Sequence, residues 1–147
     1  MGLYTELKFK VQKIPFSIFG NYVKNFGVEE SNLKDNKDYK KNDNFEKEDT
    51  GWLAGIKIGK CKKKNSWEIK YVYRRVEADA VVAAITDSDF RGGGSDAKGH
   101  EIGIGYQILD YCKAGFTFFN NDIGLNLHGD EEKTSFKRYQ FDIQFKI

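Results

Sequence analysis

The sequence predicts an all-β fold, an antiparallel up-and-down β-barrel whose strands cross a membrane. Apolar and polar side chains alternate over the last eleven residues, 137–147, and Pro15 is the chain's single proline. The connections between strand-like segments also alternate between short and long. Because successive side chains of a strand point to opposite faces, strict alternation gives one apolar and one polar face. A transmembrane strand needs about 9–11 such residues, and continuous strands exclude most prolines.

The composition fits one domain and excludes several classes of protein. The chain has 147 residues, enough for a single domain with a core. Its 24 basic and 22 acidic residues leave a net charge of only +2, too balanced to favour nucleic acid as a partner. No apolar run approaches the ~18 residues of a membrane helix. Barrel strands remain compatible, since they place lipid-facing residues at every second position, and the 15% aromatic content suits their girdles.

Seven segments are predicted to be strands, because they carry the two-residue period. In chain order they are 4–12, 14–26, 51–60, 66–77, 100–108, 112–121 and 137–147. The second segment is apolar with a weaker alternation, and a helical period approaches comparable strength only over residues 78–85. The other six segments each place a row of apolar residues on one face: Leu7, Phe9 and Val11; Trp52, Ala54, Ile56 and Ile58; Trp67, Ile69, Tyr71 and Tyr73; Ile102, Ile104, Tyr106 and Ile108; Ala114, Phe116 and Phe118; Tyr139, Phe141, Ile143, Phe145 and Ile147.

The connections between these segments sort by length. The short ones are Lys13, 61–65 and 109–111, and the long ones are 27–50, 78–99 and 122–136. Membrane barrels have short periplasmic turns and longer extracellular loops, so this alternation favours a membrane barrel. Bacterial single-chain barrels have even strand numbers, whereas seven strands are predicted here. We therefore expect the chain, taken as one domain over 1–147, to be the C-terminal portion of a larger barrel. An irregular N-terminal strand that the count misses is the alternative.

The two faces of the strands predict two environments. The predicted lipid-facing residues are Trp52, Trp67, Tyr71, Tyr73, Tyr106, Phe116, Phe118, Tyr139, Phe141 and Phe145. The predicted pore-lining residues are Lys8, Lys10, Lys57, Glu68, Lys70, Arg74, Glu101, Lys113, Arg138, Asp142 and Lys146. This lining has eight basic and three acidic side chains. Since cationic linings favour anions, we expect a mild anion preference among small hydrophilic solutes.

Two of the long connections have distinctive compositions. The glycine-rich segment 87–96 is predicted to fold over or into the pore mouth. Its predicted pore-mouth residues are Asp87, Asp89, Arg91, Gly92, Gly93, Gly94 and Asp96. A Ca²⁺ site built from the three aspartates is a less favoured alternative, because the glutamate of an EF-hand is missing. The segment 27–50 has eight acidic and five basic residues, which indicates a solvated surface loop, with bridging to lipopolysaccharide through divalent ions as the alternative.

No residue pattern predicts catalysis or a bound metal or cofactor. Cys61 and Cys112 both lie near the end of the sheet with the short turns, three inter-strand steps of ~4.8 Å apart, so we expect free thiols. Two thiols without a nearby histidine do not make a zinc site. The chain has no Gly-x-Ser-x-Gly motif, and its histidines, His100 and His128, lie at or in long connections. We expect no enzyme activity and no cofactor.

Three stretches of the chain, 15–25, 51–59 and 67–100, together resemble the putative porin family of Gram-negative outer membranes. They read PFSIFGNYVKN, GWLAGIKIG and WEIKYVYRRVEADAVVAAITDSDFRGGGSDAKGH, and they keep the order of the family. The resemblance implies an outer-membrane channel and covers the C-terminal portion of longer members. It also implies the barrel-assembly machinery as a folding partner, beside outer-membrane lipid, lipopolysaccharide and the transported solutes. Assembly into a homo-oligomer is left open.

A soluble protein is the alternative interpretation of the same pattern. In a β-sandwich or lipocalin-like binding module, the aromatic face would form the buried core and the basic face would meet bulk water. The two interpretations differ in one observable, the exposure of Tyr139, Phe141 and Ile143. A membrane barrel turns them outward, whereas a soluble module buries them.

Overall fold

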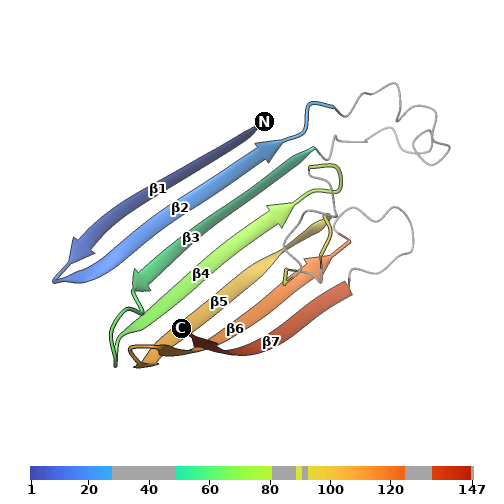
Figure 1. Ribbon diagram of the computed structural model, residues 1–147. Helices are drawn as coiled ribbons and strands as arrows, with labels where there is room; N and C mark the ends of the chain where they lie inside the picture. Colours follow the sequence, from blue (N-terminus) through green and yellow to red (C-terminus); the bar gives the residue numbers. More distant parts are fainter. Residues whose placement is uncertain (28–48, 81–88, 91–92, 125–133, 147) are drawn as a thin grey trace, which may run out of the picture.

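The structure is a single antiparallel sheet of seven strands (Figure 1). The computed structural model describes residues 1–27, 49–80, 89–90, 93–124 and 134–146. Each strand pairs with its neighbours in the chain, in the order β1 to β7. The strands are β1 (Gly2–Val11), β2 (Ile14–Lys24), β3 (Thr50–Gly59), β4 (Trp67–Val76), β5 (Ala97–Leu109), β6 (Cys112–Ile123) and β7 (Thr134–Phe145). The predicted all-β fold with seven up-and-down strands is confirmed.

Short turns join the strands at one end of the sheet, which we call the turn end; the opposite end is the loop end. Gln12 and Lys13 join β1 to β2 with φ angles of 48° and 73°. Positive φ at both positions of a two-residue turn matches the twist of a hairpin. Residues 60–66 join β3 to β4, where the Ser66 hydroxyl accepts hydrogen bonds from two backbone N–H groups of the turn. Residues 110–111 join β5 to β6.

The strand boundaries differ from the predicted ones mainly at the loop end. β5 and β7 each begin three residues earlier than predicted, at Ala97 and Thr134. Backbone pairing explains the extension, because Ala97 lies opposite Ile123 of β6 and Ile123 lies opposite Thr134. The added rows are largely polar, with residues such as Lys98 and Ser135, so apolar alternation gave no signal for them.

The predicted helical period over 78–85 falls mainly outside the described residues. Within the described part, Ala78, Asp79 and Ala80 form a turn and bend after β4. The segment 27–50 is likewise described only at its two ends, Gly27 and residues 49–50. No helix of sufficient length and apolar character to cross a membrane is present in the described ranges.

The register divides the side chains between two faces of the sheet. We call the face that carries Glu101 the inner face and the face that carries Ile102 the outer face. Along β5, inner-face Glu101 and Gln107 are 6% and 8% exposed, whereas outer-face Ile104 and Tyr106 are 48% and 45% exposed. Figure 1 shows that the sheet is curved, and the lower exposure of the inner side chains identifies the inner face as the concave one.

All ten aromatic residues that were predicted to meet lipid lie on the outer face, because cross-strand pairing links them row by row. Neighbouring rings pack against each other within this face. The ring centroids of Phe116 and Phe141 are 4.9 Å apart, as are those of Phe118 and Tyr139. Such cross-strand aromatic pairs stabilise a sheet by a few tenths to about 1 kcal/mol each. Contact with lipid itself stays a prediction.

The structure contradicts the aromatic core that the soluble alternative requires. Tyr139, Phe141 and Ile143 are 63%, 79% and 67% exposed. All strands of the described residues belong to one sheet, so no second sheet covers these side chains. The apolar outer face is long: Leu3 to Val11 on β1 covers eight residue steps, about 26 Å at ~3.3 Å per step. An apolar belt in a barrel is about 25 Å tall.

The sheet is open in the described part of the chain. β1 pairs only with β2, and β7 pairs only with β6. Because neighbouring strands alternate in direction, β1 and β7 both run from the loop end to the turn end. They therefore cannot pair with each other in the antiparallel manner, and an open sheet is what a portion of a larger barrel presents.

Candidate functional site

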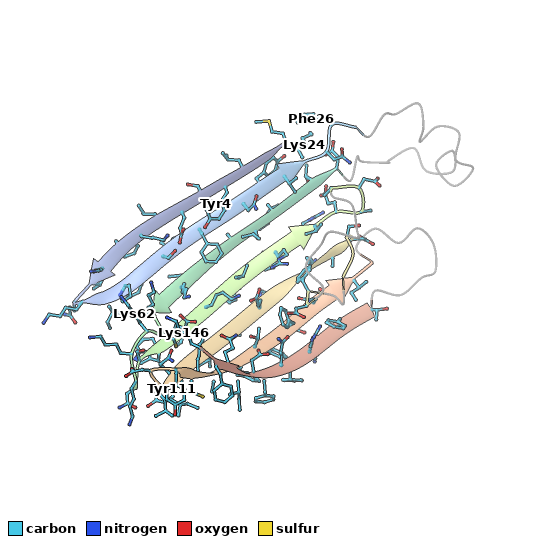
Figure 2. All side chains as sticks on the ribbon, viewed as in Figure 1. Tyr4, Lys24, Phe26, Lys62, Tyr111 and Lys146 are labelled. Carbon is cyan, nitrogen blue, oxygen red and sulfur yellow. The ribbon has the colours of Figure 1, made fainter. Side chains whose placement is uncertain are left out.

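The inner face carries charged side chains from every strand except β2. The predicted pore-lining residues within strands all lie on this face: Lys8, Lys10, Lys57, Glu68, Lys70, Arg74, Glu101, Lys113, Arg138 and Asp142. Lys146 follows the end of β7 at the turn end (Figure 2). The two-residue period of each strand explains this common orientation. Exposure to a water-filled pore stays a prediction.

Glu68 lies between two lysines on the inner face of β4, the middle strand, one residue from its turn end. Its carboxylate is 2.9 Å from Lys57 Nζ on β3 and 2.6 Å from Lys113 Nζ on β6. Its Oε2 also accepts a hydrogen bond of 3.2 Å from the backbone N–H of Cys61. The side chain of Glu68 is only 14% exposed, so its charge is well compensated. The group of Glu68, Lys57 and Lys113, which we call the central triad, retains one net positive charge.

Glu101 organises a second group of the same composition nearer the loop end. Its carboxylate forms an ion pair with Lys70 and lies 3.5 Å from Arg74 Nη2. Both cations come from β4, two residues to either side of Val72, which pairs with Glu101. Glu101 is 6% exposed. One acid again compensates only part of two basic charges.

Glycines leave room between these charged groups. Gly103 and Gly105 of β5 and Gly115 of β6 form the floor of a groove of about 190 Å³. Side chains of the central triad lie across this floor: a Cβ at Gly105 would come within 2.9 Å of Lys113 Cε and 3.0 Å of Glu68 Cγ. Small residues here therefore let long charged side chains lie along the sheet instead of standing off it.

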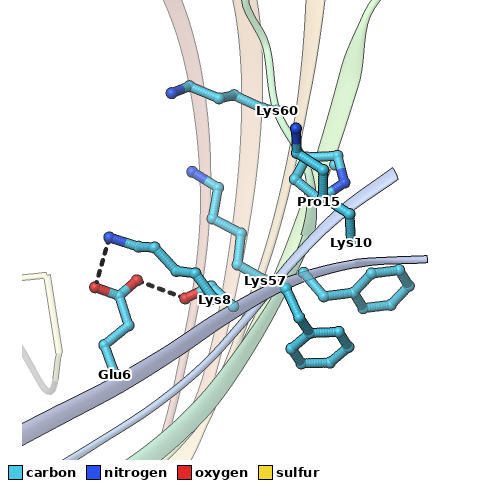
Figure 3. Close-up of a pocket in the computed structure, with 10 residues that line it drawn as sticks. Glu6, Lys8, Lys10, Pro15, Lys57 and Lys60 are labelled. Atoms are coloured by element: carbon cyan, nitrogen blue, oxygen red, sulfur yellow. Dashed lines mark hydrogen bonds and ion pairs between the residues drawn. The ribbon is translucent and has the colours of Figure 1, made fainter. Parts of the chain in front are cut away.

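A second hollow, of about 470 Å³, lies at the turn end of β1, β2 and β3 (Figure 3). Figure 3 shows the ammonium groups of Lys8, Lys57 and Lys60 on the same side of the ribbon as Glu6. Glu6 forms an ion pair of 2.9 Å with Lys8 and accepts a hydrogen bond of 2.5 Å from Ser17 Oγ. Lysines outnumber acids around this hollow as well.

Glu6 is a lining residue that the sequence reasoning missed. It has the same strand parity as Lys8, so extending the alternation of β1 by one step would have found it. Asn121 is a second such residue, because it is the last residue of the predicted strand 112–121 and is not among the predicted pore-lining residues. Asn121 is 1% exposed on the inner face, and its amide has no hydrogen-bond partner among the described residues.

The connection between β4 and β5 folds back onto the inner face. Phe90 is 3% exposed, and the Arg74 guanidinium lies 4.7 Å from its ring centroid. Asp89 forms an ion pair of 3.1 Å with Arg138 of β7. Ser95 Oγ donates a hydrogen bond of 2.6 Å to the backbone oxygen of Ala78 and ties the two ends of the connection together. This connection therefore occupies part of the concave surface near the loop end.

The predicted pore-mouth residues divide between the described and masked parts of this connection. Asp89, Gly93, Gly94 and Asp96 are described, whereas Asp87, Arg91 and Gly92 lie outside the described residues. Gly93, Gly94 and Asp96 all have positive φ, between 61° and 101°. Glycine adopts this region without the steric cost that a Cβ carries, which explains a glycine-rich reversal here. In the described ranges, no group of three or more His, Cys, Asp or Glu side chains could hold a metal ion.

Cys61 and Cys112 are free thiols in the structure. Cys61 lies in the turn between β3 and β4, outside the strands, and Cys112 opens β6. Burial, reinforced by the negative charge of Glu68, raises the pKa of the Cys61 thiol above its ordinary value. The thiolate is the reactive form of cysteine, so Cys61 is held in its less reactive form at neutral pH.

In a Cys112→Ser background, alkylation of Cys61 is expected to be slow at pH 8 and to continue rising above pH 9. Glu68→Gln removes the negative charge beside the thiol, so the pKa of Cys61 should fall and alkylation at pH 8 should become faster. Mass spectrometry of iodoacetamide adducts against pH measures both rates. Identical pH profiles with and without Glu68→Gln would contradict the proposed influence of Glu68.

Comparison with known proteins identifies the family. The family described as "Putative porin" matches residues 3–145, nearly the whole chain. No curated protein and no solved structure matches the chain. The match spans all seven strands, including both edge strands and the inner-face cations. The chain therefore belongs to the family described as "Putative porin", whose description implies a channel of the outer membrane.

Proposed function

We propose that the chain forms part of the wall of a passive diffusion channel for small hydrophilic solutes, with a mild preference for anions. The observation that carries this proposal is the charge of the inner face. With Glu6 included, the inner face and the end of β7 carry eight basic and four acidic side chains. The outer face of the same strands is apolar over most of its length. Interior charges set the selectivity of a barrel, and excess positive charge favours anions.

The ion pairs explain why the preference is mild. Glu68 and Glu101 each lie between two cations, so every such group keeps a single net positive charge. These charges are distributed along the wall from the turn end to the loop end and do not form one deep binding site. A wall of this kind raises the local concentration of anions without holding them tightly.

The channel acts through its shape and charge, and we assign no catalytic step to the chain. Glycines of the inner face keep space for water and solute above the sheet. We place the protein in the bacterial outer membrane with the turn end in the periplasm and the loop end outside, following the rule for barrel connections. Its folding partner would be the barrel-assembly machinery, and further strands would complete the barrel.

The proposal is tested by single-channel recording of the protein in planar lipid bilayers. In a tenfold KCl gradient, the reversal potential is expected to have the sign of a channel more permeable to chloride than to potassium. Replacing chloride with a large organic anion should reduce the current. Clear cation selectivity would show that the described wall does not set the charge preference.

Phe90→Ala is expected to raise single-channel conductance. Phe90 packs against Arg74 on the inner face, so removing the ring frees cross-section and loosens the segment that occupies the wall. Phe118→Ala is the matched control, because it removes an equal ring from the outer face. A similar conductance for wild type and Phe90→Ala would place the β4–β5 connection outside the conducting path.

A further inference from the structure

The charged side chains of the outer face gather at one end. Within the described strands this face carries five of them: Lys24, Arg75, Lys98, Asp122 and Lys137. All five lie in the rows nearest the loop end, and four are basic. From there to the turn end, the outer face of each described strand has no charged residue. On the four neighbouring strands β4 to β7, the outer-face charges therefore end within the same two rows.

Two adjacent rows of the sheet contain the basic residues of β4 to β7. In the first row, Arg75 lies opposite Lys98, and Lys98 lies opposite Asp122. In the second row, His100 lies opposite Asn120, and Asn120 lies opposite Lys137. With ~4.8 Å between strands and ~3.3 Å per residue, the Cα atoms of Lys98 and Lys137 are about 12 Å apart. Extended lysine side chains from both positions can reach one ligand.

The two lysines of these rows, Lys98 and Lys137, have no acidic partner within the described residues. Neither Lys98 nor Lys137 forms an ion pair with any described residue, although Asp122 lies across from Lys98. Arg75 forms an ion pair of 3.3 Å from its Nη2 to Glu77 Oε1, and its Nε has no hydrogen-bond acceptor among the described residues. Arg75, Lys98 and Lys137 against Asp122 and Glu77 leave one net positive charge. This surplus points to an anionic ligand.

His100 is held in place at the border of the patch. Its Nδ1 is 2.8 Å from the hydroxyl of Tyr71, and its ring packs edge-on against Tyr73 at 5.0 Å between centroids. These tyrosines begin the aromatic part of the outer face, with Trp52 beside Tyr73 at 5.3 Å. Tyrosine and tryptophan mark the level of lipid headgroups in barrels. The basic rows therefore lie just beyond the apolar belt, where headgroup phosphates lie.

We propose that Arg75, Lys98, His100 and Lys137 form a binding site for the phosphate groups of a lipid headgroup on the outside of the barrel. The inference rests on the proposed membrane location but not on conduction, because the site lies on the face opposite the channel wall. Arginine and lysine donors spread over about 12 Å suit a headgroup that carries two phosphates better than a single small anion. Below the site, the apolar outer face would accommodate the acyl chains of the same lipid.

The experiment measures binding of fluorescent diphosphoryl lipid A to the protein in detergent micelles. Lys98→Gln/Lys137→Gln is expected to weaken binding by at least about tenfold, since each lysine near an anionic lipid surface contributes appreciably. Lys62→Gln/Lys63→Gln is the matched control, because it removes the same charge at the turn end, where Figure 2 places Lys62. Its affinity should equal that of the wild type. Equal losses in both variants would mean general charge attraction and overturn the site.

Two further measurements keep the inference testable if the double variant folds poorly. The wild-type protein should bind lipid A without phosphates at least about tenfold more weakly than the diphosphoryl form; equal binding overturns the proposal. If inorganic phosphate displaced the fluorescent lipid as effectively as unlabelled diphosphoryl lipid A does, the site would be a free-anion site, which also overturns the proposal.

Single-channel conductance of Lys98→Gln/Lys137→Gln should match the wild type. If the wild-type channel showed no preference for anions, the proposed selectivity would be refuted, whereas lipid binding could still be measured.

Discussion

Gly99→Ala is expected to destabilise the folded protein by about 3 kcal/mol. A Cβ at this position would lie 2.2 Å from Asn121 Oδ1, 2.5 Å from the backbone oxygen of Asn120 and 2.6 Å from Asn121 Cα. Two of these three contacts are with backbone atoms of the directly paired strand, which move only if the pairing of β5 with β6 opens. Overpacking in a closed site typically costs about 1–3 kcal/mol, and backbone contacts place Gly99 at the upper end.

Gly103→Ala is the matched control for Gly99→Ala. Gly103 lies on the same strand and the same face, four residues away, and the nearest atom to its Cβ would be Lys70 Cε at 3.5 Å. That is an ordinary contact with a flexible side chain, so we expect a change within about 0.5 kcal/mol, in either direction. Denaturant titration in micelles, followed by tryptophan fluorescence, measures both variants. Equal midpoints for the two variants would show that the β5–β6 pairing yields at Gly99.

Neutralising the two lysines of the central triad is expected to reduce the ratio of anion to cation permeability by about fivefold. Lys57→Gln/Lys113→Gln changes the local charge from one positive to one negative, because Glu68 remains. A unit charge at 4 Å in water changes the energy of a passing ion by about 1 kcal/mol, roughly a fivefold change in local concentration. Most ions pass farther from the wall, where distance and salt weaken the effect, so we expect about fivefold for the whole change of two charges. Reversal potentials in a KCl gradient measure the ratio.

Glu68→Gln provides the opposite change within the same triad. It leaves both lysines in place and raises the local charge from one positive to two, so the anion preference should increase. Glutamine keeps the shape of the side chain and its capacity to accept the hydrogen bond from Cys61 N. If both triad variants shift the ratio in the same direction, or neither shifts it, the central triad does not contribute to selectivity.

The extent to which the fold could be predicted depended on how cleanly each strand alternates. Alternation alone predicts β5 and β7, and the same pattern assigns Lys70 and Tyr71 to opposite faces independently of the strand pairing. β2 is harder to predict from alternation, because Phe19 and Val23 point to the inner face among polar neighbours. Inner-face apolar residues of this kind fill space above a glycine: a Cβ at Gly55 would meet the Phe19 ring at 2.5 Å.

The candidate site could be predicted as a set of residues but not as an arrangement. The sequence placed Lys57, Glu68 and Lys113 on one face, yet their ion pairs join β3, β4 and β6, which only the cross-strand register brings together. The contact of Phe90 with Arg74 had no sequence signal either, because it depends on a long connection returning to the inner face. The grouping of Arg75, Lys98 and Lys137 on the outer face likewise depends on the register of four strands, β4 to β7.

The sequence by itself determined which side of the sheet each strand residue occupies, because side chains of an extended chain alternate with a period of two whatever the neighbouring strands are. It also determined the order of short turns and long connections. Only the tertiary structure decided which residues meet across strands, since register depends on the turns and on every pairing in the sheet together. The charged triads, the packing of Phe90 and the basic rows of the outer face all follow from that register.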